Sequence, residues 1–485
     1  MRFVDKDLLS VQEARILMEN AGEARKALSL FPQEKLDRIL ESMLAAAEGH
    51  LKELAGQSRE ETGYGSSQDK YRKNRMIWEQ MSRRLKDMRC VGLVEENTEE
   101  GTAKIGVPMG TIVALIPATS PVSTTLYIAS IAVKSGNAVV FAPHPRAERT
   151  VQKTVKLLAE AACAAGLPEG GIACPDTVTK EGTIQMMAHP ETTLIINTGV
   201  PQLLDAPGTG NKPLICGGIG PSPVFIERTA EVSRAVKDII DSRSFDCGTS
   251  AGAEQYVVAD YQIADEVKKE MIRMGAYFMD EKEEGLLMGL LCPGQKEKDP
   301  EYMGKPAVWL AERAGFTVPG NTRVLVSQQQ YISDFNPYAK ALLCPVLVFY
   351  IEKDWMFACE KCIELLESCG HTLAIHSRDE EVIRQFMLKK PVGRILINTP
   401  AAFGAMGITT NLFPAMTLGG LTAGLGITSD NVSPMNLVYL RSAARGVREW
   451  GDGEISAYKE IDRDENMDGT DVSGLLRMIL EQLEQ

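Results

Sequence analysis

Hydrophobic and polar positions follow two different patterns along this chain. Over residues 8–60 apolar side chains recur every three or four positions, which places them on one face of a helix. Residues 70–88 continue as a further helix that carries many charges. From residue 105 onward, short apolar runs replace this spacing. We therefore expect a helical N-terminal segment followed by a different architecture.

The short apolar runs indicate buried strands that alternate with helices. In parallel sheets ligands bind beyond the carboxyl ends of the strands. The alternation predicts an α/β fold whose parallel sheets are covered on both faces. Strands are expected at 111–116, 138–142, 193–197, 214–216, 255–259 and 343–350, and helices at 123–135, 147–165 and 229–243.

Three strand-end loops carry residues suited to ligand binding. His144 and Arg146 together could bind a phosphate or diphosphate. The alternative interpretation is that they form a rigid turn with an exposed histidine and bind no ligand. The other two loops are Thr198-Gly199 and Gly217-Gly218, which also follow predicted strands. The candidate binding residues are Pro143, His144, Arg146, Thr198, Gly199, Gly217 and Gly218.

The segment 244–255 is the most informative stretch of the sequence. Its small residues and glycines permit close approach of a ligand, and Cys247 supplies a thiol. Such a thiol acts as a nucleophile when its pKa is lowered. The alternative is a glycine-rich connection before the next strand.

A cysteine group further along the chain does not predict a metal site. Cys359, Cys362, Cys369 and His371 match no common zinc spacing. We interpret the first cysteines as small buried residues of a helix, and no metal is predicted.

Residues 451–470 are rich in glycine, aspartate and glutamate and are expected to form a linker. In residues 471–485, Val472, Leu476, Ile479 and Leu483 share one helical face. A short amphipathic helix on a tether is typical of a docking element. The alternative is a terminal helix that packs on its own subunit or on an oligomer partner.

Charge and composition narrow the class of protein. The 485 residues carry a formal net charge of −13, of which −7 lies in the last 35 residues. An acidic balance argues against nucleic-acid binding. No apolar stretch is long enough to span a bilayer, and the start lacks a signal-peptide core. We expect a cytoplasmic protein whose ten cysteines are reduced.

Several motifs together resemble the CoA-acylating aldehyde dehydrogenases, which include acetaldehyde and propionaldehyde dehydrogenases. The similarity covers roughly residues 8–450, and its pieces are specific only in combination. They are 106–110 (GVPMG), 116–121 (IPATSP), 142–147 (APHPRA), 244–255, 370–372 (GHT) and 429–432 (SDNV).

The resemblance implies a fold, a reaction and cofactors. The fold has a Rossmann-like NAD domain at 1–226, completed by about 416–450, a catalytic domain at 227–415 and a small oligomerisation element. The reaction is short-chain aldehyde + NAD + CoA to acyl-CoA + NADH, in a homo-oligomer. Thr119 and Ser120 belong to the oxyanion loop, and the strand-end residues above would bind the cofactors.

The sequence departs from this family at the reacting positions. Ala251 occupies the position of the nucleophilic cysteine, Ser120 replaces the usual Asn, and Ala341 replaces a Glu expected to hold the nicotinamide ribose. Ile215 stands where hydrolytic relatives carry a general-base Glu, which fits transfer to CoA. Three explanations stay open: a paralogue that has lost the chemistry and keeps a binding or assembly role, an engineered Cys-to-Ala trap, or Cys247 as a substitute thiol.

The C-terminal tail is similar to the targeting segments of some acylating aldehyde dehydrogenases. Those segments carry their enzymes into bacterial microcompartments. The resemblance implies that residues 471–485 contact shell proteins and that the protein resides in the microcompartment lumen.

Overall fold

The computed structural model describes residues 5–200, 203, 210–217, 220–291, 301–331, 337–366, 370–420, 426–447, 449–450 and 455–456. The chain divides into two compact units. The first comprises Met1–Gly92 and Gly106–Tyr439, and the second comprises Leu93–Ile105 and Leu440–Gln485.

Four helices open the first unit, which confirms the helical N-terminal segment. Asp5 caps the first helix by accepting hydrogen bonds from two backbone amides of its first turn, and Ser66 caps the fourth. Such caps satisfy amides that have no partner within the helix. Gly63, with φ 72°, ends the third helix. The helices are α1 (Lys6–Leu28), α2 (Gln33–Glu48), α3 (Leu51–Thr62) and α4 (Ser67–Arg84).

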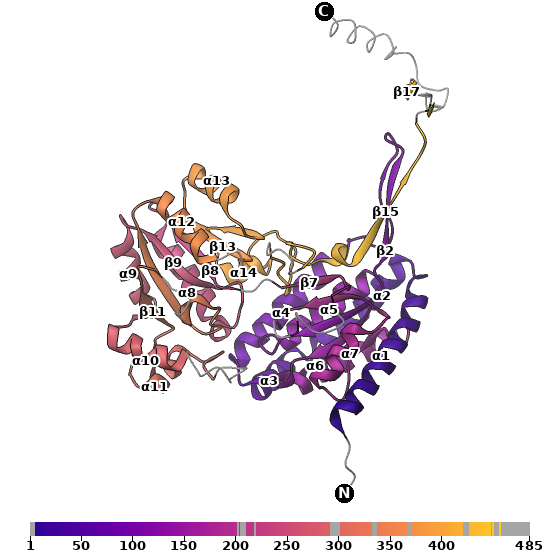
Figure 1. The fold of residues 1–485 in the computed structure, drawn as a ribbon, viewed down its shortest axis with the longest axis horizontal. Helices are drawn as coiled ribbons and strands as arrows, with labels where there is room; N and C mark the ends of the chain where they lie inside the picture. Colours follow the sequence, from indigo (N-terminus) through magenta and orange to yellow (C-terminus); the bar gives the residue numbers. More distant parts are fainter. Residues whose placement is uncertain are drawn as a thin grey trace, which may run out of the picture. The chain divides into compact units, whose positions relative to one another are not determined.

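A five-stranded parallel sheet follows, with the order β5-β4-β3-β6-β7. All six residues of β3 and of β4 are buried, as the apolar runs predict. Its strands are β3 (Thr111–Ile116), β4 (Ala138–Pro143), β5 (Ile172–Ala173), β6 (Thr192–Asn197) and β7 (Leu214–Cys216). Its helices are α5 (Pro121–Lys134), α6 (Glu148–Ala164) and α7 (Lys180–Ala188), and α1 packs beside α7 (Figure 1).

A seven-stranded parallel sheet has the order β10-β11-β12-β9-β8-β13-β14. Its strands are β8 (Ser222–Ile226), β9 (Glu254–Asp260), β10 (Ala276–Phe278), β11 (Val324–Gln328), β12 (Val346–Glu352), β13 (Thr372–His376) and β14 (Arg394–Ile397). Its helices are α8 (Val232–Ser244), α9 (Ala264–Arg273), α10 (Glu281–Leu291), α11 (Ala307–Ala314), α12 (Trp355–Leu366), α13 (Glu380–Lys389) and α14 (Ala401–Ala405).

Alternate residues of the central strands face two separate cores. Val257 of β9 packs in the same cluster as residues of α8 and α9, whereas its neighbour Val258 packs with residues of α10 to α13. Both faces of the sheet are therefore covered, as expected for parallel strands. β8 lies inside the range 1–226 yet pairs with β9 and β13. The proposed division at residue 226 stays a prediction.

A three-stranded sheet contains most of the described part of the second unit. Its order is β1-β2-β15, with β1 at Gly92–Asn97, β2 at Thr102–Pro108 and β15 at Val438–Ala444. Two short strands, β16 (Glu449–Trp450) and β17 (Ile455–Ser456), pair antiparallel. The predicted helix at 471–485 and most of the predicted linker at 451–470 lie outside the described residues.

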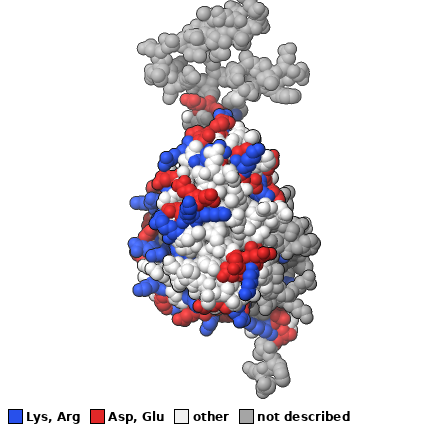
Figure 2. Space-filling view, turned by 90° about the vertical axis from the view of Figure 1, so that its left-hand side faces the viewer, with Lys and Arg blue, Asp and Glu red and all other residues white. Residues whose placement is uncertain are grey.

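Surface charge is mixed on the face that Figure 2 shows, where basic and acidic side chains lie interspersed. In the part of the chain that the structure describes, no helix combines the length and the hydrophobicity that crossing a bilayer requires.

Candidate functional site

Loops from both large sheets meet around one cavity of about 240 Å³ in the first unit. The loops follow β3, β4, β6 and β7 of the five-stranded sheet, and further walls come from the segment before β9 and from the start of β13. This is the strand-end position expected for a ligand site in parallel sheets. The residues named by the sequence that line it are Thr119, Ser120, His144, Thr198, Gly199, Gly217, Ala251 and His371.

The loop after β3 forms one wall of this cavity. The Ser120 hydroxyl lies 3.0 Å from the Thr124 hydroxyl, one turn into α5. The carbonyl of Thr119 accepts a hydrogen bond of 3.0 Å from the Lys70 ammonium. A lysine from α4 thus fixes the backbone of the predicted oxyanion loop.

The loop after α8 forms another wall of the cavity and has an unusual backbone. Asp246, Cys247 and Gly248 all have positive φ values, of 49°, 54° and 74°. A Cβ atom at Gly248 would lie 2.5 Å from the carbonyl carbon of Cys344, so glycine is required there. The turn leads to Ala251, which is exposed at the cavity.

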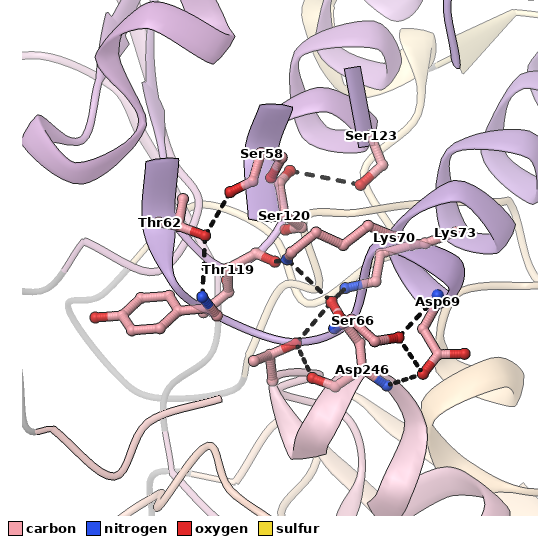
Figure 3. Close-up of polar contacts among 12 residues, drawn as sticks. Ser58, Thr62, Ser66, Asp69, Lys70, Lys73, Thr119, Ser120, Ser123 and Asp246 are labelled. Carbon is pink, nitrogen blue, oxygen red and sulfur yellow. Dashed lines mark hydrogen bonds and ion pairs between the residues drawn. The ribbon is translucent and has the colours of Figure 1, made fainter. Parts of the chain in front are cut away.

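A buried ionic network holds this turn in place (Figure 3). Asp246 Oδ2 accepts hydrogen bonds from Lys73 Nζ at 2.8 Å and from Lys70 Nζ at 3.2 Å. Asp246 Oδ1 accepts another from the Ser66 amide at 3.0 Å. Lys70 therefore joins the two walls, since it also binds Thr119.

The charged groups in this network shift one another's pKa values. Burial alone would raise the pKa of Asp246, but the ammonium groups of Lys73 and Lys70 and the hydrogen bonds hold it below its ordinary value. Burial lowers the pKa of Lys70, and Lys73 lowers it further, against the opposing effect of Asp246. A buried carboxylate that faces two cations stays ionised at neutral pH.

Cys247 does not lie at the cavity that contains Ala251. It lines a separate surface groove of about 910 Å³, with Asp69, Arg72 and Phe245 among its walls. Burial, together with Asp246 and Asp69, raises the pKa of its thiol to about 11. The structure therefore does not bring the proposed substitute thiol to the position of the family nucleophile.

His371 contributes a neutral imidazole beside Ala251. Burial and the Arg394 guanidinium lower its pKa to about 3, while the backbone of Gly220 and of Ala251 opposes this shift. Arg394 fixes the start of β13 through a hydrogen bond of 2.7 Å to the His371 carbonyl and another of 2.7 Å to the Gly419 carbonyl.

A second cavity of about 280 Å³ adjoins the carboxyl ends of β3 and β4. Its walls are mostly apolar, and Leu115, Ile116, Pro143 and Val200 are among them. His144 lines both cavities and accepts a hydrogen bond from the Arg146 amide through Nδ1 at 3.1 Å. An apolar cavity at this place suits a flat ring such as adenine.

The remaining predicted residues are placed as follows. The Arg146 side chain is exposed, with its guanidinium 5.7 Å from the centre of the Tyr64 ring. Ile215 is fully buried in β7. Gly218 lies outside the described residues.

Sequence reasoning missed several residues that line the first cavity. They are Tyr64, Lys73, Met303, Leu343, Met406 and Met416. Lys73 lies on the helix predicted at 70–88, which carries many charges, and nothing in the local pattern marks this lysine as buried.

Comparisons with known proteins agree with this architecture. The family model described as "Aldehyde dehydrogenase family" matches residues 6–292. The bifunctional aldehyde-alcohol dehydrogenase of Escherichia coli K12 is 34% identical over 444 residues, which cover 90% of this chain and 50% of that protein. The chain thus spans about half the length of the first curated relatives that it matches.

Two solved structures extend the comparison. An acetylating aldehyde dehydrogenase from Geobacillus thermoglucosidasius is 37% identical with a TM-score of 0.89, and the match covers 93% of this chain and 100% of that one. A propionaldehyde dehydrogenase from the fucose utilisation microcompartment of Clostridium phytofermentans is 26% identical with a TM-score of 0.80, covering 88% and 96%.

The two parallel sheets and the cavity at their strand ends define an α/β protein with a candidate ligand-binding site. This chain belongs to the aldehyde dehydrogenase family.

Proposed function

We propose that this chain carries the binding site of a CoA-acylating aldehyde dehydrogenase, for a short-chain aldehyde, NAD and CoA. The similarity to an acetylating enzyme along almost the whole chain supports this. So do the two cavities that share His144, since one suits an adenine ring and the other the reacting groups. In the family reaction NAD accepts a hydride and CoA takes the acyl group.

The second part of the proposal concerns whether the chain catalyses the reaction, and it rests on one observation. Ala251 faces the cavity at the family's nucleophile position, and none of the described residues that line this cavity is a cysteine. A methyl group forms no thiohemiacetal, so no enzyme-bound thioester can follow. We therefore propose that the chain binds the ligands of the reaction without catalysing it, as a silent paralogue.

The test is CoA- and acetaldehyde-dependent NADH formation by the purified chain and by Ala251→Cys. We expect no turnover from the natural sequence and measurable turnover from Ala251→Cys, because the surrounding walls are in place. Ala251→Ser is the matched control, since it adds an atom of similar position but weaker nucleophilicity.

Two outcomes would contradict these expectations, and the first would also refute the proposal of a silent paralogue. Turnover by the natural sequence would show that another group acts as the nucleophile, and its loss in Cys247→Ser would identify that group. No turnover by a folded Ala251→Cys variant would show that Ser120 or Ala341 also prevents the reaction.

We further propose that residues 471–485 direct the protein into a bacterial microcompartment. The amphipathic spacing in the tail and the similarity to a microcompartment enzyme support this. Deletion of 471–485 should leave the thermal unfolding midpoint unchanged and abolish co-purification with shell proteins. A matched control replaces Gln482 and Gln485, which lie off the apolar face, with alanine. Shell co-purification by the truncated chain would rule out this role.

A further inference from the structure

A cysteine and a lysine are in contact between α12 and the end of α13. Cys359 belongs to α12, and Lys390 follows the last residue of α13, 31 positions further along the chain. Lys390 Nζ donates a hydrogen bond to Cys359 Sγ at 2.7 Å and another to the Cys359 carbonyl. The same ammonium lies 4.4 Å from the centre of the Phe386 ring. These contacts hold the lysine nitrogen against the sulfur.

The surroundings of this pair admit little water. Cys359 and Lys390 are 5% and 7% exposed, and Cys359 and Phe386 pack in the same apolar cluster. Neither residue of the pair lines the two cavities described above. The contact is therefore separate from the candidate ligand-binding site, and the proposed function does not account for it.

The neighbouring Cys362 provides a contrast on the same helix. It lies about one turn further along α12 and is fully buried, and burial raises the pKa of its thiol to about 12. Cys359 keeps slight exposure, and a lysine nitrogen donates a hydrogen bond to its sulfur. Peroxide oxidises the thiolate form of a cysteine, and a neighbouring cation supports that form. Cys359 is therefore the better placed of the two for oxidation.

We propose that Cys359 and Lys390 form a reversible covalent link, a sulfenamide, when the protein meets a peroxide. The peroxide oxidises the thiol to a sulfenic acid, and its O–O bond breaks with release of one water. The ammonium releases one proton to solvent, and the lysine nitrogen attacks the sulfur. The S–O bond breaks, and the hydroxyl leaves as a second water with one proton of the amine. An N–S bond then joins the two side chains.

The geometry favours this condensation over further oxidation of the sulfur. A nitrogen held 2.7 Å from the sulfur is already within the distance of a reacting pair. Without such a partner, a sulfenic acid proceeds to sulfinic acid, which is irreversible. Two molecules of an external thiol reverse the link, because they become a disulfide while the cysteine and the lysine are restored. The link is thus a reversible modification that spares Cys359 and ties α12 to the end of α13.

Peptide mapping of the natural chain after treatment with hydrogen peroxide tests the inference. Trypsin cleaves after lysine and arginine, so Cys359 falls in residues 354–361, here called the cysteine peptide. Lys390 falls in residues 390–394, here called the lysine peptide. The next two cysteines fall in a different peptide, 362–378. A link to lysine and a disulfide between neighbouring cysteines therefore give different products.

We expect the cysteine peptide joined to the lysine peptide, at a mass about 2 Da below the sum of the two unlinked peptides. Dithiothreitol added before digestion should release both. The untreated protein, with its thiols alkylated before digestion, is the control. A cysteine peptide that is recovered unlinked after peroxide, or joined to peptide 362–378, would overturn the inference.

Variants then assign the link to one nitrogen. Lys390→Met should abolish the joined peptides, whereas Cys362→Ala should keep them. Lys389→Met is the matched control, because Lys389 is the adjacent lysine, is exposed and lies 5.7 Å from the centre of the Trp355 ring. A cysteine peptide that stays linked in Lys390→Met would refute the assignment. The mapping of the natural chain needs no variant, so it decides the inference even if Lys390→Met fails to fold.

Discussion

The pKa of one histidine, His376, shows how strongly burial in this protein disfavours a charged side chain. His376, at the end of β13, is 2% exposed. Burial, with a contribution from Arg234, lowers its pKa from 6.5 to about 4. The imidazole is therefore neutral in the folded chain at physiological pH, while the unfolded chain exposes an ordinary histidine.

The sign of the resulting pH dependence follows from this difference. Between about pH 6.5 and pH 4 the unfolded chain binds a proton at His376 that the folded chain does not. Stability from this group is thus present above pH 6.5 and falls as the pH is lowered, by about 1.4 kcal/mol per unit. Between pH 7 and pH 5 the total loss is about 2 kcal/mol.

His376→Gln should remove this component of the pH dependence. Urea unfolding at pH 7 and pH 5 should show a fall in the free energy of unfolding that is smaller in the variant by about 2 kcal/mol. An identical fall in both proteins would show that His376 is protonated in the folded state.

At the scale of elements, the loop before α4 depends on a glycine. Gly65 has φ +68°, and a Cβ atom there would lie 1.7 Å from Asp246 Oδ1. Glycine therefore lets the chain pass the carboxylate that binds Lys70 and Lys73. Gly56, within α3, is different, since a Cβ atom there meets nothing within 4 Å.

These two glycines make a matched pair. Gly65→Ala should lower the free energy of unfolding by about 2 kcal/mol or more, through backbone strain and displacement of Asp246. Gly56→Ala should raise it by about 0.5–1 kcal/mol, because alanine is the better helix former. Chemical denaturation measures both, and a neutral Gly65→Ala would contradict the close approach.

The same elements show which features the sequence predicts and which it does not. The runs 111–116 and 214–216 coincide with β3 and β7, since buried parallel strands are continuously apolar. β8 and β13 were missed, because the former contains Pro223 and the latter begins and ends with polar residues. β15 was missed because its residues after Val438 are exposed and show no buried face.

The sequence predicts some residues of the candidate site and not others, because local patterns report only on neighbouring positions. Thr119 and Gly217 can be predicted as site residues because each comes soon after a predicted strand. The burial of Lys70 depends on Asp246, 176 positions away, and local patterns carry no information on such a pair.

At the scale of the molecule, the site requires both large sheets. Thr119 and His144 follow strands of the five-stranded sheet, whereas Ala251 and His371 precede strands of the seven-stranded sheet. The buried contacts of Lys70 with Asp246 and Thr119 connect these loops, so the geometry of the cavity depends on the packing of the whole first unit.

The strand β15 is the place where we expect a homo-oligomer to form. It is an edge strand of its sheet, and the side chains of Tyr439 and Leu440 are 53% and 47% exposed. Edge strands with exposed backbone and apolar side chains pair readily with another chain. Leu440→Lys combined with Ser442→Pro should therefore lower the molar mass measured by light scattering after size exclusion. Leu30→Lys is the control, since Leu30 is 82% exposed and lies outside any strand. An unchanged mass in a β15 variant that keeps its unfolding midpoint would exclude this strand as the interface.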